Sequence, residues 1–333
     1  MRIISFLLLI LVVVVPVSAQ DDVLTVYSGR SESLIAPLIE QFTEATGIEV
    51  EVLYAGTAAV ANQILEEGEN SPADAVILQD AGALGALAKE GILSELPEEV
   101  VSLVVEPAYV SPAGLWVGVS GRARVLVYNP ELLEETGLEL PESIFDLTGE
   151  EWRGLVGWVP TNASLQTQVT AIRLVEGDDI ALEWLEGIVA NEPQVYEGNG
   201  AVVEAVIAGE IPVGLVNHYY LYRYLAEDPD ITTTMHYFPN GDLGALVNVA
   251  GAGVVVTTNQ PDEALQFVEY LLSEEAQIYF AEETFEYPLI EGVETSFELV
   301  PLDEIEVPEI DLSDLDDLQG TLEMIEASGA LDG

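Results

Sequence analysis

The sequence contains no cysteine and only two histidines, His218 and His236. Disulfides therefore play no part in the fold, and thiolate metal sites and a lipid anchor on an N-terminal cysteine are excluded. The sequence also lacks a Gly-x-Ser-x-Gly elbow, a His-Glu-x-x-His motif and a Walker loop. Each histidine is better interpreted as structural than as catalytic. An exported hydrolase is thus a poorly supported class, and the chain is not expected to be an enzyme.

Basic residues are nearly as scarce, with 8 Lys and Arg against 60 Asp and Glu and a formal net charge of -52. Nucleic acid is excluded as a partner, because binding it needs basic residues that displace counterions. Acidic side chains dispersed over a solvated surface serve solubility or a salty habitat. Attraction of cations is the functional alternative, and it is not specific to any one ion.

Long apolar runs are absent except at the N-terminus. Met1-Arg2, the run Ile3 to Val15 and the small residues through Ala19 have the pattern of a signal peptide over residues 1–19. Mature protein starting near Gln20 is expected. No later stretch is apolar over the ~18 residues that a membrane span needs. The sequence therefore predicts an exported protein, periplasmic or extracellular.

Strands and helices alternate along the first part of the chain. Residues 23–27 and 48–54 are predicted strands on either side of a helix with an apolar stripe from Leu34 to Phe42, which Gly47 ends. Residues 73–78 are the next predicted strand, and they run into Gln79. This alternation predicts an α/β fold with mainly parallel sheets flanked by helices.

A chain of 333 residues is long enough for two domains. Two short strands, 116–119 and 125–128, are predicted around Arg122 and Arg124, where the chain crosses between lobes. We expect a ligand cleft between two lobes. The N-lobe is formed by residues 20–121 and 245–300, and the C-lobe by residues 122–244. Residues 301–333 form a tail whose helix packs on a lobe.

The stretch around residues 213–224 offers a candidate metal site. Val213 to Val216 is a predicted buried strand, and Asn217 is expected to cap a helix that opens with Tyr219 and Tyr220. The partial positive charge at a helix N-terminus favours phenolate, and ionised oxygens suit a hard cation such as Fe3+. The alternative is that both tyrosines are half-buried packing residues with solvated hydroxyls.

Small polar residues between a short strand at 155–160 and a helix at 165–175 offer a candidate anion site. Unpaired backbone N–H groups at Asn162, Ala163 and Ser164 suit phosphate or carbonate, although ordinary helix capping is the alternative. Asn199 is expected to cap a helix over 201–208. Asn199 and Asn217 would then face one cleft.

Several of these motifs, taken together and in order, resemble the periplasmic ferric-iron-binding proteins of ABC transporters, the bacterial transferrin-like group. The resemblance covers nearly the whole mature chain, and its motifs are Val26 to Arg30, Asn70 to Asp74, Ser120 to Arg124, Trp158 to Ser164 and Asn217 to Tyr220. It implies a two-lobe, hinged solute-binding fold that closes on Fe3+. It also implies that the protein, a monomer, passes the ion to an inner-membrane ABC permease.

The same resemblance implies roles for particular residues. Tyr219 and Tyr220 match the family's iron-binding tyrosine pair. The positions that hold a synergistic anion in many members, whether carbonate, phosphate or citrate, are matched by Asn162, Ala163, Ser164, Asn199 and Asn217.

Two positions depart from the family pattern. Ser31 stands where some members have a ligand histidine, and Gln79 stands where they have a ligand glutamate. Where some members have a third tyrosine, this chain has Ser164. The N-lobe is therefore expected to supply few direct ligands, with Arg30 and Gln79 contacting the anion. An oxyanion or a small organic solute remains the alternative ligand for the same fold.

Overall fold

The computed structural model describes residues 23–293, 295–297 and 299–332. The predicted signal peptide, residues 1–19, and the expected mature start near Gln20 lie outside the described residues. Within the described ranges, no helix combines the length and the apolar character that crossing a membrane requires.

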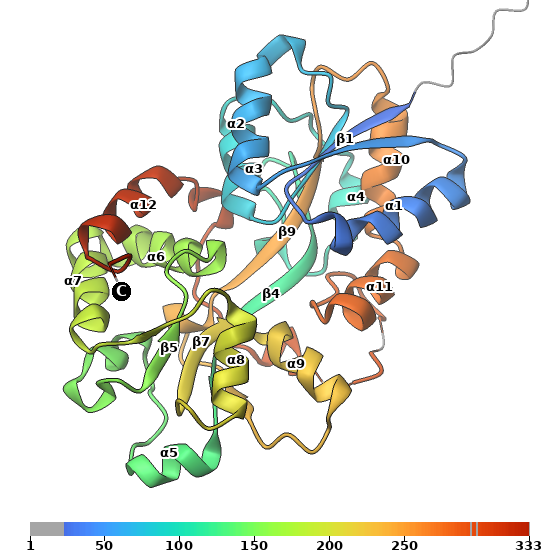
Figure 1. Ribbon diagram of the computed structural model, residues 1–333. Coiled ribbons are helices and arrows are strands. Elements are labelled where there is room, and N and C mark those ends of the chain that lie inside the picture. The colour runs from blue at the N-terminus through green and yellow to red at the C-terminus, as the bar shows by residue number, and fades with distance from the viewer. Residues whose placement is uncertain (1–22, 294, 298, 333) are drawn as a thin grey trace, which may run out of the picture.

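Parallel strands and the helices around them form the first lobe (Figure 1). Its α1 helix buries the predicted stripe, including Leu38 and Phe42, and ends at Gly47, whose φ of 78° suits glycine. The predicted strand and helix order is confirmed here. The elements are β1 (Leu24–Ser28), α1 (Glu32–Thr46), β2 (Val50–Tyr54), α2 (Thr57–Glu67), β3 (Ala75–Leu78), α3 (Ala81–Lys89), α4 (Glu98–Val101), α10 (Pro261–Leu271) and α11 (Glu274–Thr284).

The second lobe repeats this plan with shorter strands. Its β5 pairs in parallel with β6 and with β7, so the carboxyl ends of β5 and β7 meet at one edge of the sheet. The elements are α5 (Pro130–Thr136), β5 (Val156–Trp158), α6 (Ala163–Glu176), α7 (Asp178–Ala190), β6 (Gln194–Val195), α8 (Asn199–Ile207), β7 (Val213–Asn217), α9 (His218–Glu227) and β8 (Thr234–His236).

Two long strands, β4 (Val117–Tyr128) and β9 (Val247–Val254), join the lobes, and the strand order is β2-β1-β3-β9-β4-β7-β5-β6. Up to Ala123, β4 pairs with β9, and from Arg124 onward it pairs with β7. The prediction of two short strands at 116–119 and 125–128 was wrong, because the polar residues between them continue the ladder. The lobe boundaries at 121/122 and 244/245 stay predictions.

The C-terminal tail lies between the lobes. A short 3₁₀ turn, Leu312–Asp314, packs on α3, and α12 (Leu318–Ala327) packs on α6 and α7. Figure 1 shows α12 over α6, with the preceding red segment reaching towards α3. The predicted tail helix is therefore confirmed, and the tail touches both lobes.

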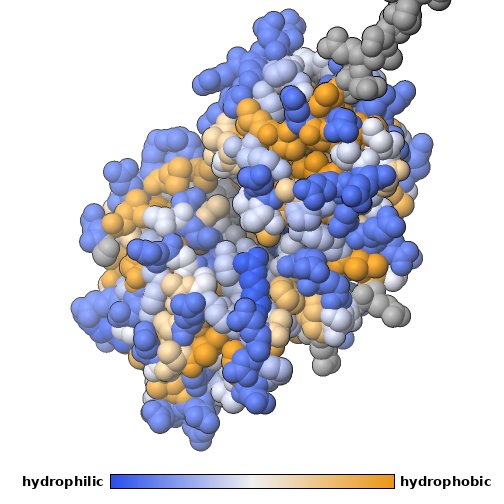
Figure 2. Space-filling model, turned by 45° about the vertical axis from the view of Figure 1, so that its right-hand side comes forward, coloured by the Kyte–Doolittle hydropathy of each residue, from blue (hydrophilic) through white to orange (hydrophobic). Residues whose placement is uncertain are grey.

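Hydrophilic side chains cover most of the face shown in Figure 2, and apolar residues there gather in a few patches. The cores beneath this surface are largely apolar, and the side chains of Trp116, Trp158 and Trp184 are almost fully buried. Burial of this apolar surface stabilises the fold despite the large negative charge.

Candidate functional site

Tyr219 and Tyr220 lie in the first turn of α9, directly after β7. Their rings stack with centroids 4.4 Å apart and planes 30° apart. The guanidinium carbon of Arg223 lies 5.0 Å from the Tyr219 ring centroid and 5.4 Å from that of Tyr220. Two neighbouring helical residues therefore present their rings to the same region, as the candidate metal site requires.

The two phenols have different environments, because Tyr219 is buried and Tyr220 is half-buried. Burial raises the pKa of the Tyr219 phenol well above its usual range, the neighbouring Tyr220 raises it further, and Arg122 acts in the opposite direction. In the ion-free protein Tyr219 is thus a phenol, and the helix N-terminus alone does not make it a phenolate. A cation that binds there must displace the proton.

A chain of hydrogen bonds joins most of the predicted anion-binding residues. Ser164 N–H donates to the Asn162 carboxamide oxygen (3.0 Å), and Asn217 Nδ2 donates to the Ser164 hydroxyl (2.9 Å). Arg124 Nη1 in turn donates to Asn217 Oδ1 (3.1 Å). The carboxyl ends of β5 and β7 account for this meeting, since Asn162 follows β5 and Asn217 is the last residue of β7. Ala163 and Ser164 line the cleft between the lobes, whose volume is about 640 Å³.

Arg122 and Arg124 are both buried, and Arg122 also lines this cleft. With Ser164, Asn217 and Asn248 they line a small cavity, and Arg124 Nη2 and Arg122 Nε have no hydrogen-bond partner in the described structure. Burial lowers the pKa of Arg124 to about 10, while Tyr219 and Tyr220 oppose that shift. Buried guanidinium N–H groups that lack a partner suit an incoming anion.

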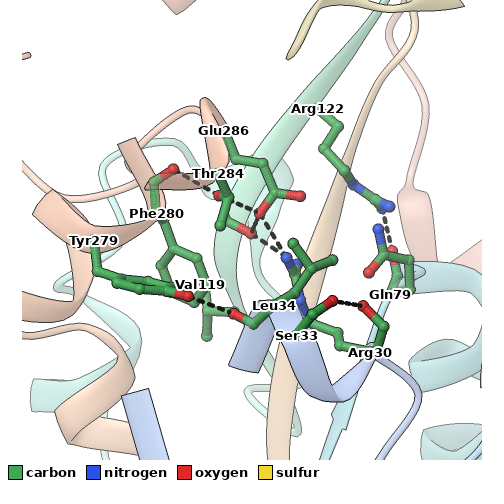
Figure 3. Close-up of polar contacts among 12 residues, drawn as sticks. Arg30, Ser33, Leu34, Gln79, Val119, Arg122, Tyr279, Phe280, Thr284 and Glu286 are labelled. Atoms are coloured by element: carbon green, nitrogen blue, oxygen red, sulfur yellow. Dashed lines mark hydrogen bonds and ion pairs between the residues drawn. The ribbon is translucent and has the colours of Figure 1, made fainter. Parts of the chain in front are cut away.

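The residues expected to make secondary contacts differ in position. Gln79 lines the cleft; its carbonyl oxygen accepts a hydrogen bond from Arg122 Nη2 (Figure 3), and its buried Oε1 has no partner in the described residues. Ser31 is exposed at the start of α1, with its hydroxyl 3.3 Å from that of Ser33.

Arg30 is occupied by a protein carboxylate. Its Nη2 lies 2.8 Å from Glu286 Oε2 and its Nη1 3.2 Å from the Ser120 hydroxyl, all of them buried (Figure 3). The expected contact between Arg30 and an anion therefore has a competitor that the sequence did not suggest, because Glu286 lies 256 residues further along the chain.

Two capping predictions were wrong. Asn217 stands at the N-cap position of α9 but makes no capping bond, because its side chain bonds Arg124 and Ser164 instead. Asn199 is the first residue of α8 rather than its cap, and Gly198 occupies the N-cap position. Asn199 is buried, and its Nδ2 has no partner in the described structure. It is not part of the hydrogen-bonded chain of Asn162, Ser164 and Asn217.

His218 and Asp80 make contacts that hold the elements around the site together. His218 Nδ1 accepts a hydrogen bond from the Ala123 N–H (3.2 Å), and its ring stacks on Tyr287 with centroids 4.5 Å apart. Asp80 Oδ2 accepts a hydrogen bond from the Thr167 hydroxyl (2.7 Å), which joins α3 of the first lobe to α6 of the second. Asp80 is the N-cap residue of α3, and its partner Thr167 lies 87 residues further along the chain.

The described residues contain no group of three or more His, Asp or Glu side chains that could hold a metal ion. Phenolate oxygens are a further kind of hard ligand for a metal ion. The paired phenols of Tyr219 and Tyr220 are of that kind.

Residues 27–278 match the model of the bacterial extracellular solute-binding protein family. Over 309 residues, covering 92% of each chain, the sequence is 32% identical to the "Major ferric iron-binding protein" of Neisseria meningitidis serogroup B. It is 29% identical over 317 residues to the "Fe(3+)-binding periplasmic protein" of Serratia marcescens, covering 94% of this chain and 92% of the relative.

Solved structures agree with these matches. Iron-bound HitA from Pseudomonas aeruginosa is 36% identical with a TM-score of 0.83, covering 92% of this chain and 99% of that one. IdiA (FutA) of Trichodesmium, in complex with iron and citrate, is 30% identical with a TM-score of 0.77 and the same two coverages. The two-lobe fold expected from the sequence is confirmed.

Proposed function

Because the chain belongs to the family of bacterial extracellular solute-binding proteins, we propose that it binds Fe3+ through Tyr219 and Tyr220 and delivers it to an ABC permease. The stacked tyrosine pair at the start of α9 carries the proposal. Its relatives in Serratia marcescens and Neisseria meningitidis, which are named as ferric iron-binding proteins, support it. The protein is a transport binding protein and not an enzyme.

The charges around the tyrosines suit a ferric phenolate site. Arg122, Arg124 and Arg223 are three of the eight basic residues in the whole sequence, and all three lie close to the pair. Positive charge nearby favours loss of the phenol protons. Since the ligands must be deprotonated, iron affinity should fall as the pH falls.

An anion completes the coordination in this proposal. Arg124, Ser164 and Asn217 line a cavity of only about 10 Å³, so carbonate, phosphate or citrate would lie in the adjoining cleft, which Ser164 also lines, and direct an oxygen towards Arg124. Ala163 and Gln79 line the adjoining cleft and complete the proposed set. Citrate is favoured among organic anions by the iron and citrate complex of the Trichodesmium relative.

A second candidate function keeps the anion site without the metal. The unpartnered guanidinium nitrogens of Arg122 and Arg124 would hold an oxyanion or a small carboxylate solute alone, with no metal at the tyrosines. Both candidate functions include export to the periplasm or the extracellular space. In both, the protein acts as a monomer beside an inner-membrane permease.

The test is a visible spectrum of the metal-stripped mature protein titrated with Fe3+ in the presence of carbonate, phosphate or citrate. We expect a phenolate-to-Fe3+ charge-transfer band that disappears in the Tyr219→Phe, Tyr220→Phe double variant. Tyr224→Phe is the matched control, because Tyr224 lies on the same helix but its hydroxyl bonds Glu204 (2.7 Å). A parent protein without a band, yet stabilised against unfolding by the anion alone, would favour the second function.

A further inference from the structure

The C-terminal tail leaves the second lobe, touches the first and then returns. Before this excursion, the Glu306 carboxylate accepts a hydrogen bond from the backbone N–H of Asn240, in the loop after β8. The turn Leu312–Asp314 then packs on α3 of the first lobe, and α12 packs on α6 of the second. The tail thus has two attachments to one lobe, with a contact to the other between them.

Helix α3 has glycines where the tail backbone lies against it. A Cβ on Gly82 would come within 2.0 Å of the Leu315 carbonyl oxygen, and one on Gly85 within 2.2 Å of the Ser313 carbonyl oxygen. Glycine inside a helix is less stable than alanine. These two glycines are one helical turn apart, so together they make a seat for the tail backbone that any larger residue would fill.

Opposite charges surround the seat. Lys89, the single lysine of the sequence, places Nζ 3.1 Å from Asp314 Oδ1 and 2.9 Å from Asp316 Oδ2. In a chain of net charge -52, one of the few basic residues therefore joins the tail to the first lobe.

The return to the second lobe is more deeply held. Arg173 of α6 lies 2.9 Å from the Asp317 carboxylate and also donates to the Asp317 carbonyl oxygen (3.2 Å) and the Thr321 hydroxyl (3.0 Å). A buried hydrogen bond of 2.8 Å joins the hydroxyls of Thr170 and Thr321. The Arg173 side chain is only 13% exposed, against 48% for Lys89, so water competes less for these bonds.

We propose that residues 311–317 are a strap that holds the two lobes together across the cleft and lets go of α3 when the cleft opens. The chain is held on the second lobe by Glu306 before the strap and by Asp317 at the strap's end. The contact that breaks is therefore the one between the strap and α3. Leu315 and Leu318 line the cleft, which places the strap at the cleft's edge. Two strongly acidic lobes repel each other, and the strap opposes that repulsion.

The test measures the distance between the lobes in the metal-free mature protein. Because the chain has no cysteine, Glu66→Cys on α2 and Glu176→Cys on α6, both exposed, accept spin labels at one site in each lobe. Gly85→Ala removes the seat and favours the helix, and Lys89→Gln removes the ion pairs. We expect each variant to shift the distance distribution towards the open state. For Lys89→Gln the open-to-closed ratio should rise about threefold, and the double variant should show a larger shift.

Arg153→Gln is the matched control, because Arg153 makes an exposed ion pair with Glu192 within the second lobe. It should leave the distribution unchanged. Hydrogen exchange at residues 311–316 reports in parallel whether the tail has left α3. An unchanged distribution in the Gly85→Ala, Lys89→Gln variant overturns the proposal, whether the tail stays seated or comes free. Because no iron is present, failure of the ferric function would not affect this result.

Discussion

Each buried arginine of this acidic chain has a different kind of partner. Arg30 has the carboxylate of Glu286, whereas Arg124 has the neutral oxygens of Gln168 and Asn217 and one nitrogen with no partner in the described residues. A buried guanidinium without a carboxylate is costly unless something offsets its charge. At the residue scale, Arg124 is therefore the side chain on which anion binding should depend most.

Arg124→Gln should weaken binding of the synergistic anion by about tenfold or more, because a charge-assisted hydrogen bond is lost. The measurement is the concentration of carbonate, phosphate or citrate that gives half of the ferric charge-transfer band. Arg153→Gln, which removes an exposed arginine, should leave that concentration unchanged. An equal loss in both variants would mean that only the overall charge matters.

His218 should make the stability of the fold depend on pH. Burial lowers the pKa of His218 to about 4 from 6.5, so between these values the unfolded chain binds a proton that the folded protein does not. Stability contributed by the neutral ring is therefore present above pH 6.5 and is lost as the pH falls towards 4, by about 3 kcal/mol in all.

In the variant His218→Gln, the denaturant concentration at the unfolding midpoint should change less between pH 6.5 and pH 4 than it does in the parent protein. His236→Gln serves as the control, since His236 is half-buried and burial lowers its pKa less. A parent midpoint that does not change between pH 6.5 and pH 4 would contradict the assignment.

At the scale of elements, the sequence predicted the helices whose positions depend on local signals. Apolar periodicity and Gly47 located α1, and the polar residues after β5 located the start of α6. The division of β4 into two strands failed because Arg122 and Arg124 look like a break in an apolar run. They continue the strand because β9 and β7 supply partners from far along the chain. The capping role of Asn217 failed for the same reason, since Arg124 and Ser164 compete for its side chain.

A bulge in β4 gives an element that can be tested. The register shifts between Gly118 and Ser120, and the carbonyl of the extra residue, Val119, accepts a hydrogen bond from Gln277 Nε2 (2.7 Å). Gln277 is fully buried in α11 and also bonds Leu271 and Leu289. This side chain thus holds α11 on the strand that joins the lobes.

Gln277→Met keeps the volume but leaves buried backbone groups unpaired, so it should lower the free energy of unfolding by about 2–4 kcal/mol. Urea unfolding measures the effect. Gln266→Met is the control, because Gln266 is exposed on the neighbouring helix α10 and should change stability by less than about 0.5 kcal/mol. A loss confined to α11 in hydrogen exchange would locate the damage there.

At the scale of the whole molecule, the acidic surface opposes closure of the cleft. Contacts between the two lobes include the pairing of β4 with β9, the bond between Asp80 and Thr167, the stacking of His218 on Tyr287, and the tail. The sequence predicted two lobes and a tail helix, but not that the tail spans them. Its contacts pair residues such as Lys89 and Asp314, which are 225 positions apart, and no local pattern reports such a pair.

The pairing of Lys89 with Asp314 and Asp316 also gives the protein a built-in chemical reporter. A single lysine means that, apart from the N-terminus, one amine in the mature chain can be acylated. The hydrogen bond to Asp316, the largest of the effects that favour the charged form, raises the pKa of Lys89, and an ammonium ion is not a nucleophile. While the strap is seated, that amine should therefore react more slowly with acylating reagents. The rate at which the unaltered protein takes up one acyl group therefore counts how often its cleft comes open.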